Sequence, residues 1–217
     1  MKGDPIKTNI LSVNIIPNAD PMLRKQLAVP EEHLSLGLIS TDCDDVSYAA
    51  LDEATKKARV RVVYARSMYA GSSNASTRLA GEFIGIISGE DPAEVRSGLE
   101  AAVKFIEEEA HFTTADDSGS IVYFAQCISR TGSYLSSMAG VAEGTAMAYL
   151  IAPPVEAVIG LDAALKAADV VMNVFYGPPT ETNFAGGLLT GDQAACKAAC
   201  DAFAQAVCSV ADRPVNF

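Results

Sequence analysis

The chain has 217 residues, of which 49% are hydrophobic and 20% are charged, which is enough apolar material for a buried core. Its formal net charge of -11 argues against nucleic-acid binding, because proteins that bind the phosphate backbone present a basic face. No apolar run is long enough to span a bilayer and the N-terminal region has no signal-peptide pattern, so we expect a cytoplasmic protein that does not enter a membrane.

The first half is predicted to alternate strands with helices. Asp20 before Pro21 is typical of the start of a short helix. Asp44 or Asp45 is expected to cap a helix that runs to Ala58. A third helix is predicted after Asp91, with an apolar face made of Val95, Leu99, Ala102, Val103 and Ile106. The predicted strands are Asn9–Ile16, Leu34–Ser40, Arg59–Ala65 and Gly81–Ser88.

The second half is predicted to follow the same order. Arg130 to Ser133 is interpreted as a turn, and Tyr176 to Asn183 as a loop. Helices are expected at Pro153–Ala168 and from Asp192 to Ala211, the latter with an inward face of Cys196, Ala199, Cys200, Phe203 and Val207. With an odd number of cysteines and no CxxC pair, Cys196 and Cys200 are interpreted as core residues. The predicted strands are Ser120–Ser129, Ala146–Ala152, Val170–Phe175 and Phe184–Thr190.

This order reflects an internal repeat. Leu51–Val60 returns as Leu161–Val170, with six of ten positions identical at an offset of 110 residues. At an offset of 101, Arg96 corresponds to Lys197. The repeat predicts two copies of one domain, at residues 1–110 and 111–217. Each is expected to be an α+β domain in which helices cover an antiparallel sheet.

The segments Asp52-Glu53-Ala54-Thr55-Lys56, Arg130-Thr131-Gly132-Ser133 and Gly191-Asp192-Gln193-Ala194-Ala195 carry a resemblance to a known family. The chain resembles the bacterial microcompartment (BMC) shell proteins, in the tandem, circularly permuted form found in ethanolamine-utilisation compartments. The resemblance implies a homotrimer in which six domains imitate a hexameric tile of the shell. It also implies pores that pass or gate metabolites, packing against other shell proteins, and a site for ethanolamine.

Glu82 is the clearest difference between the two copies. Alignment of Gly89 with Gly191 places Glu82 opposite Phe184, so the first copy has a carboxylate in an otherwise apolar strand. A buried carboxylate requires a cation or several hydrogen-bond donors. Glu82 is therefore interpreted either as part of a site for an ammonium group or as a solvated or arginine-paired residue at the strand end.

Asp44 and Asp45 are the other acids that the second copy lacks, since Pro153 and Pro154 occupy the corresponding region. Helix capping is one interpretation of the two aspartates. The other is that one or both join Glu82 in holding an ammonium group, which has three donors and no acceptor.

Four further residues enter the predicted ethanolamine site through the resemblance. It implies that Thr182, Asn183 and Phe184 help to bind the ligand, with hydrogen-bonding groups on its hydroxyl end, and that Phe112 lies nearby. Without it, Thr182 and Asn183 are typical of a turn and Phe112 of a core aromatic residue.

The predicted loop from Arg66 to Ala80 is longer than its counterpart and rich in small residues. We hypothesise that three copies of it close over the threefold axis of a trimer and open by rearranging.

The sequence does not favour an enzyme. Its two histidines, His33 and His111, have no cysteine or carboxylate at a ligand spacing that repeats a known metal site, and no phosphate-binding glycine loop or nucleophile elbow occurs. No cofactor is expected, although a corrinoid or metal guest at a pore is conceivable. A soluble protein that senses small amines, without a shell role, and a small amine-metabolising enzyme are the alternatives to a shell protein.

Overall fold

The computed structural model describes residues 1–68, 82–178 and 180–215, and they form two compact units. Unit 1 comprises Met1–Lys7, His111–Thr131 and Ser136–Phe217, and unit 2 comprises Thr8–Ala110 and Gly132–Leu135. The prediction that the domains are residues 1–110 and 111–217 is therefore wrong for residues 132–135, which belong to unit 2, and for the first seven residues. They belong with the second half because Pro5 and Ile6 pair with Thr113 and Phe112.

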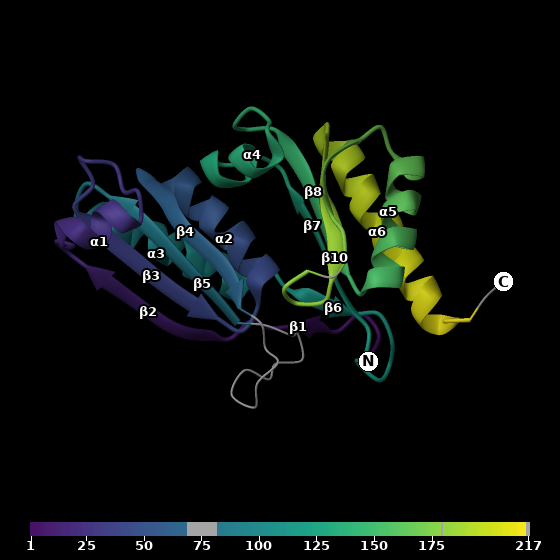
Figure 1. Cartoon of the computed structure of the whole chain (residues 1–217). Coiled ribbons are helices and arrows are strands. Elements are labelled where there is room, and N and C mark those ends of the chain that lie inside the picture. The colour runs from purple at the N-terminus through teal and green to yellow at the C-terminus, as the bar shows by residue number, and fades with distance from the viewer. Residues whose placement is uncertain (69–81, 179, 216–217) are drawn as a thin grey trace. The chain divides into compact units, whose positions relative to one another are not determined.

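Unit 2 is a four-stranded antiparallel sheet in the order β2-β3-β5-β4. Helices α2 and α3 lie side by side against the sheet (Figure 1). A smaller apolar cluster includes Ala19, Leu36 and Ile86, with Leu27 and Val29 packed against it. The elements are β2 (Ile10–Ile16), α1 (Pro21–Gln26), β3 (Ser35–Thr41), α2 (Asp44–Lys57), β4 (Val60–Met68), β5 (Glu82–Gly89) and α3 (Pro92–Glu108).

Unit 1 has a six-stranded sheet in the order β1-β6-β7-β8-β10-β9, on which α5 and α6 pack together. The last three pairings, β7-β8, β8-β10 and β10-β9, repeat those of unit 2 in the same order. The elements are β1 (Pro5–Ile6), β6 (Phe112–Thr114), β7 (Val122–Ile128), α4 (Ser133–Ala139), β8 (Ala146–Ala152), α5 (Pro154–Ala167), β9 (Val171–Tyr176), β10 (Ala185–Gly191) and α6 (Gln193–Asp212).

The register of the strands confirms the duplication in detail. Ser35 pairs with Gly89 in unit 2, and Ala146 pairs with Gly191 in unit 1. Helices α2 and α5 each have 14 residues, and their first residues are 110 positions apart. Both units are therefore α+β domains built on one plan, as the repeat predicts.

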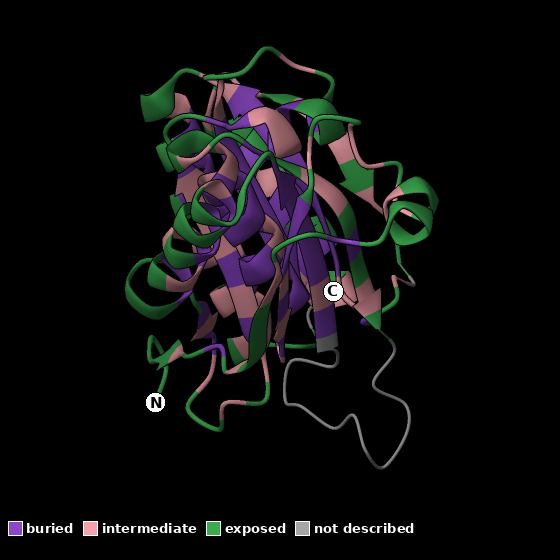
Figure 2. Cartoon of the chain, turned by 90° about the vertical axis from the view of Figure 1, so that its left-hand side faces the viewer, coloured by how far each residue is buried: buried purple, intermediate pink, exposed green. Residues whose placement is uncertain are grey.

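The helices lie close to the sheets and to each other where glycine occupies the contact. A Cβ atom at Gly85 would lie 2.8 Å from a side-chain atom of Leu51 on α2, and one at Gly160 on α5 would lie 2.6 Å from the ring of Phe203 on α6. Figure 2 shows buried residues concentrated on the strands and on the inward sides of the helices. The five residues predicted to face inward on α6 are all buried, which confirms that interpretation of Cys196 and Cys200.

Most predicted helices and strands are present, with shifts of a few residues at their ends. Asp20 caps α1 through its side chain, as predicted, and Asp91 and Asp192, where helices were predicted to start, cap α3 and α6 in the same way. Strand β4 continues through Arg66 to Met68, so the predicted loop begins later than expected, and residues 69–80 of it lie outside the described part of the chain. Within that part, no helix combines the length and apolar character needed to cross a membrane.

The predicted turn at Arg130–Ser133 is wrong at its end, because Ser133 begins helix α4. The first turn of this helix is held by side chains of α2 within unit 2. The carboxylate of Asp52, which is fully buried, accepts hydrogen bonds from the backbone N–H groups of Gly132 at 2.7 Å and Leu135 at 2.8 Å. Thr55 Oγ1 accepts a third from Ser133 at 3.1 Å. These bonds satisfy N–H groups that a helix start leaves without partners.

The duplication supplies a matched test of this interaction. We expect Asp52→Ala to lower the free energy of unfolding by about 1–3 kcal/mol, because it leaves two buried N–H groups unpaired. Asp162, its counterpart on α5, is exposed and forms an ion pair with Lys166. Asp162→Ala is therefore expected to change the free energy of unfolding by less than about 0.5 kcal/mol. Urea unfolding of both variants checks this, and equal losses would contradict the assigned role of Asp52.

Candidate functional site

Asp44 and Asp45 are the first two residues of α2, and each is only 7% exposed. The prediction that one of them caps this helix is wrong for the N-cap position, because Cys43 occupies it and makes no capping hydrogen bond through its side chain. Asp44 Oδ1, within the first turn, accepts a hydrogen bond from the Asp45 N–H at 2.9 Å. Two adjacent carboxylates are thus buried at a helix N-terminus, where the helix dipole favours negative charge. That dipole offsets part of the cost of removing them from water.

The surroundings of Asp44 combine polar and aromatic groups from unit 2. Burial raises the pKa of the Asp44 carboxyl, while hydrogen bonds from the Ser67 side chain and the Asp45 backbone oppose the rise. Ser67 Oγ also lies 2.9 Å from the hydroxyl of Tyr48. The Tyr48 ring meets Phe83 edge-on at 4.8 Å between centroids and stacks on Tyr134 at 6.3 Å.

Glu82 is the first residue of β5, and its backbone pairs with that of Met68 on β4. The next residue, Phe83, pairs with Thr41, the last residue of β3. Since α2 begins three residues after Thr41, the backbone places Glu82 at the end of the sheet from which α2 starts. The side chain of Glu82 lies outside the part of the chain that the structure describes.

Phe112, Thr182, Asn183 and Phe184 all lie in unit 1. Phe112 is a buried aromatic residue, stacked on Phe124 with ring centroids 5.4 Å apart and touching the edge of Phe184 at 5.8 Å. Within this chain, Phe112 is therefore a core aromatic residue, as one of its two interpretations predicts.

Thr182 and Asn183 form a tight turn before β10. The Asn183 N–H donates to the Thr180 carbonyl at 3.1 Å, and Thr180 Oγ1 donates to the Phe184 carbonyl at 2.8 Å. Asn183 has a φ of 61°, a left-handed conformation that asparagine tolerates better than most residues. The turn leaves the Asn183 side chain exposed and Thr182 buried.

The seven predicted site residues therefore fall into two sets, one in each unit: Asp44, Asp45 and Glu82 in unit 2, and the remaining four in unit 1. Three residues beside the acids were not predicted from the sequence: Tyr48, Ser67 and Tyr134. Tyr48 could have been found, because it lies four residues after Asp44 and therefore on the same side of α2. Ser67 was missed because the strand β4 was predicted to end before it.

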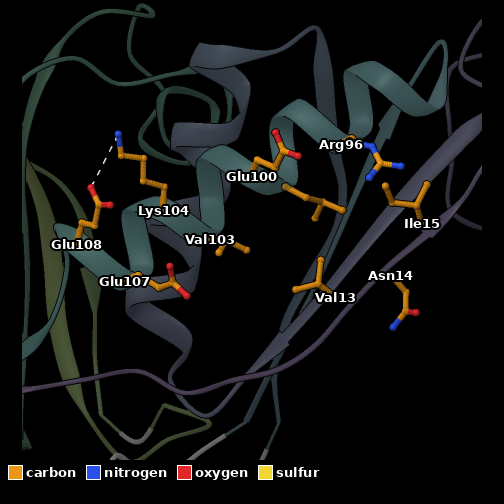
Figure 3. A pocket seen from close by; sticks show the side chains of 10 residues that line it. Val13, Asn14, Ile15, Arg96, Glu100, Val103, Lys104, Glu107 and Glu108 are labelled. Carbon is orange, nitrogen blue, oxygen red and sulfur yellow. Dashed lines mark ion pairs between the residues drawn. The ribbon is translucent and has the colours of Figure 1, made fainter.

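A separate groove of about 600 Å³ lies between β2 and α3 (Figure 3). Val13 and Val103 contribute apolar side chains, and Glu100, Glu107 and Lys104 contribute charged ones. Lys104 forms an ion pair with Glu108 at 3.8 Å. None of the seven predicted site residues lines this groove.

The described residues contain no group of three histidine, cysteine, aspartate or glutamate side chains arranged to hold a metal ion. Two sequence-based expectations stay predictions: that the protein uses no cofactor, and that a corrinoid or metal guest at a pore is conceivable.

Comparison with known proteins identifies relatives over the whole chain. The BMC domain family model matches residues 35–115. The bacterial microcompartment shell protein EutL of Clostridium perfringens (strain 13 / Type A) is 64% identical over 100% of both chains. The crystal structure of EutL from Leptotrichia buccalis C-1013-b is also 64% identical, with a TM-score of 0.96 over 100% of each chain. A trimeric shell protein, PduB, shares the fold at 21% identity, with a TM-score of 0.76 over 94% of this chain and 89% of that one.

The raised pKa of Asp44 predicts a pH-dependent effect of Asp44→Asn. A carboxyl group with a raised pKa in the folded state contributes most to stability below its ordinary pKa of 3.8, and this contribution is lost as the pH rises through the folded-state value. The variant cannot ionise, so its unfolding temperature should exceed that of the unmodified protein at neutral pH, and the difference should shrink on acidification. Calorimetry across this range measures it, with Asp201→Asn on the exposed side of α6 as control. A difference that does not change with pH would contradict the prediction.

Proposed function

Because this chain belongs to the family of bacterial microcompartment shell proteins that includes EutL, we propose that it forms trimeric, pseudo-hexameric tiles that bind ethanolamine and whose pores pass or gate small metabolites. Its role in the shell is structural and not enzymatic. The chain contributes two BMC-type domains, so three copies supply the six domains that a hexagonal tile requires.

The full-length similarity to EutL carries the proposed role, and the duplicated sheet supports it. The relative with a trimeric structure, PduB, has the same fold. A shell protein packs against other shell proteins, and tiles with six similar edges suit that packing. The alternative of a soluble amine sensor without a shell role is disfavoured by the same similarity.

The buried acids at the start of α2 support ethanolamine as the ligand. An ammonium group donates three hydrogen bonds and accepts none, so it binds best where several anionic oxygens converge. Asp44 and Asp45 supply such oxygens in a largely dehydrated place, and the backbone brings Glu82 to the same end of the sheet. Charge-assisted hydrogen bonds are roughly twice as strong as neutral ones, so an ammonium there offsets the cost of burying the acids.

For the other end of the ligand we retain the sequence-based assignment. Thr182, Asn183 and Phe184, with Phe112, are proposed to bind the hydroxyl end of ethanolamine. Gating by the predicted loop from Arg66 to Ala80 also remains part of the proposal. Its first three residues belong to β4, and residues 69–80 lie outside the described part of the chain. A ligand biases a gate only by the difference between its affinities for the open and closed states.

Calorimetric titration with ethanolamine tests the binding. Asp44→Asn and Glu82→Gln keep the size of each side chain but remove its charge, and each is expected to weaken binding by about tenfold to a hundredfold. Acidification through the pKa of Asp44 should also weaken the binding of ethanolamine to the unmodified protein, because the protonated Asp44 carboxyl group is neutral. Glu107→Gln on α3 is the matched control. Unchanged affinity in both site variants would exclude the acids as the ammonium site.

Light scattering coupled to size-exclusion chromatography tests the assembly. We expect the mass of a trimer of the 22.7 kDa chain, because each chain supplies two domains and a pseudo-hexameric tile requires six. A monomer at micromolar concentration would favour the amine-sensor alternative. Ethanolamine incubated with the protein should be recovered unchanged, as a structural protein requires.

A further inference from the structure

A chain of hydrogen bonds connects Asp44 to the hydroxyl group of Tyr48 within unit 2. The Ser67 side chain forms a hydrogen bond with the Asp44 carboxyl group, and Ser67 Oγ lies 2.9 Å from the Tyr48 hydroxyl oxygen. Asp44 and Tyr48 lie one turn apart on α2, whereas Ser67 is on β4 and pairs with Phe83 on β5. The helix and the sheet therefore both contribute to one polar network beside the buried acids.

The chemistry of the three groups fixes the direction of this chain when Asp44 is ionised. A carboxylate only accepts hydrogen bonds, so the Ser67 hydroxyl must donate its single proton to Asp44. The Ser67 oxygen can then only accept from Tyr48, so the Tyr48 hydroxyl is the donor of the 2.9 Å contact. Hydrogen bonds in such a chain strengthen one another, so Tyr48 stabilises the negative charge of Asp44 through Ser67.

Two aromatic rings hold the side chain of Tyr48 in place. Phe83, which is fully buried, meets the Tyr48 ring edge-on at 4.8 Å between centroids, and Tyr134 stacks on it at 6.3 Å. These contacts are made by the ring and the contact with Ser67 by the hydroxyl. Replacement of Tyr48 by phenylalanine therefore removes one hydrogen bond and keeps the packing.

The second copy of the domain lacks the whole network. The offset of 110 residues gives the counterparts of Asp44 and Tyr48, and the register of the strands gives that of Ser67. None of these counterparts has a hydrogen-bonding side chain, and they are Pro154, Val158 and Gly177. The helices and strands that carry these positions are present in both copies. The fold of the domain therefore does not require the tyrosine and the serine, which occur only in the copy that has the acids.

The other titratable groups that act on Asp44 come from the same end of unit 2. Asp45 lies beside it, and Glu82 is the third acid of the proposed site. Cys43 and Tyr48 also interact electrostatically with Asp44. Burial raises the pKa of the Cys43 thiol and of the Tyr48 hydroxyl, and the charges of the two aspartates raise both further. Both groups are therefore neutral near neutral pH, and the charge changes at this end of unit 2 belong to the acids.

We propose that Tyr48 and Ser67 are positioning residues of the ethanolamine site, which hold the Asp44 carboxylate ionised and oriented for the ammonium group. The inference rests on the proposed function, because both residues act on the ligand only through Asp44. An ionised Asp44 attracts the ammonium group directly, whereas a protonated one must first lose its proton. The network therefore increases the fraction of the free protein that is ready to bind the ligand.

Calorimetric titration with ethanolamine between about pH 5 and pH 8 tests the proposal on Tyr48→Phe and Ser67→Ala. Each variant is expected to weaken binding by about threefold to tenfold at the acidic end, because Asp44 loses the support of a hydrogen bond and its pKa rises. The loss should shrink as the pH rises, since Asp44 then ionises in the variants as well. Titration in buffers of different ionisation enthalpy counts the protons released on binding. Near the midpoint of the Asp44 titration, both variants should release more protons than the unmodified protein.

A double-mutant cycle separates this role from a structural one. In the Asp44→Asn background, Tyr48→Phe should have no further effect on ethanolamine binding, because no charge is left to support. Tyr64→Phe, at a tyrosine that is 40% exposed on β4, is the matched control and should bind ethanolamine as the unmodified protein does. Circular dichroism verifies that each variant is folded.

The outcomes distinguish this inference from the proposed function. Full affinity in both Tyr48→Phe and Ser67→Ala, or a loss of equal size at every pH and in both backgrounds, would overturn the positioning role alone. An unmodified protein that does not bind ethanolamine would overturn the proposed ligand and the positioning role together.

Discussion

Close packing of two helices on one face of each sheet is the constraint on which the structure depends. The positions that both repeats share, Leu51 with Leu161 and Ala54 with Ala164, are buried in both units. Leu51 and Leu161 each lie against a strand that has a glycine at the point of contact, Gly85 and Gly187. Because both copies must meet this demand, these positions keep the same residue in both. Other buried positions differ in residue type, such as Leu99 and Cys200, and so do the ends of the two sheets.

The differences at the ends of the two sheets concern charge. At the start of α2 the first copy has two aspartates, where α5 begins with Pro154 and Val155. A buried pair of carboxylates does not improve the packing of a helix on a sheet, and burial raises the pKa of Asp44. Because these buried acids lower the stability of the fold, we expect them to have a function. Binding an ammonium group would be such a function, and it would also offset the free-energy cost of burying the two carboxylates.

Much of this fold could be predicted from the sequence, because long amphipathic helices and regular strands leave periodic patterns. The inward face of α6 was predicted residue by residue, whereas Phe105 on α3 was missed. The elements not predicted are short and depend on distant partners: β1 and β6 pair across the chain, and α4 is held by Asp52 and Thr55. The acids of the candidate site followed from comparing the repeats, but Ser67 and Tyr134 did not, because strand ends and loop contacts leave no local pattern.

The pairing of β1 with β6 means that unit 2 interrupts unit 1 along the chain. A cut after residue 110 would separate β1 from its partner strand, so the two repeats are not two independently severable halves. The same topology orders events on the ribosome, which makes the chain from its N-terminus. Strand β1 emerges first but has no partner until Phe112–Thr114 have followed, so nearly all of unit 2 is available to fold before the sheet of unit 1 can be completed.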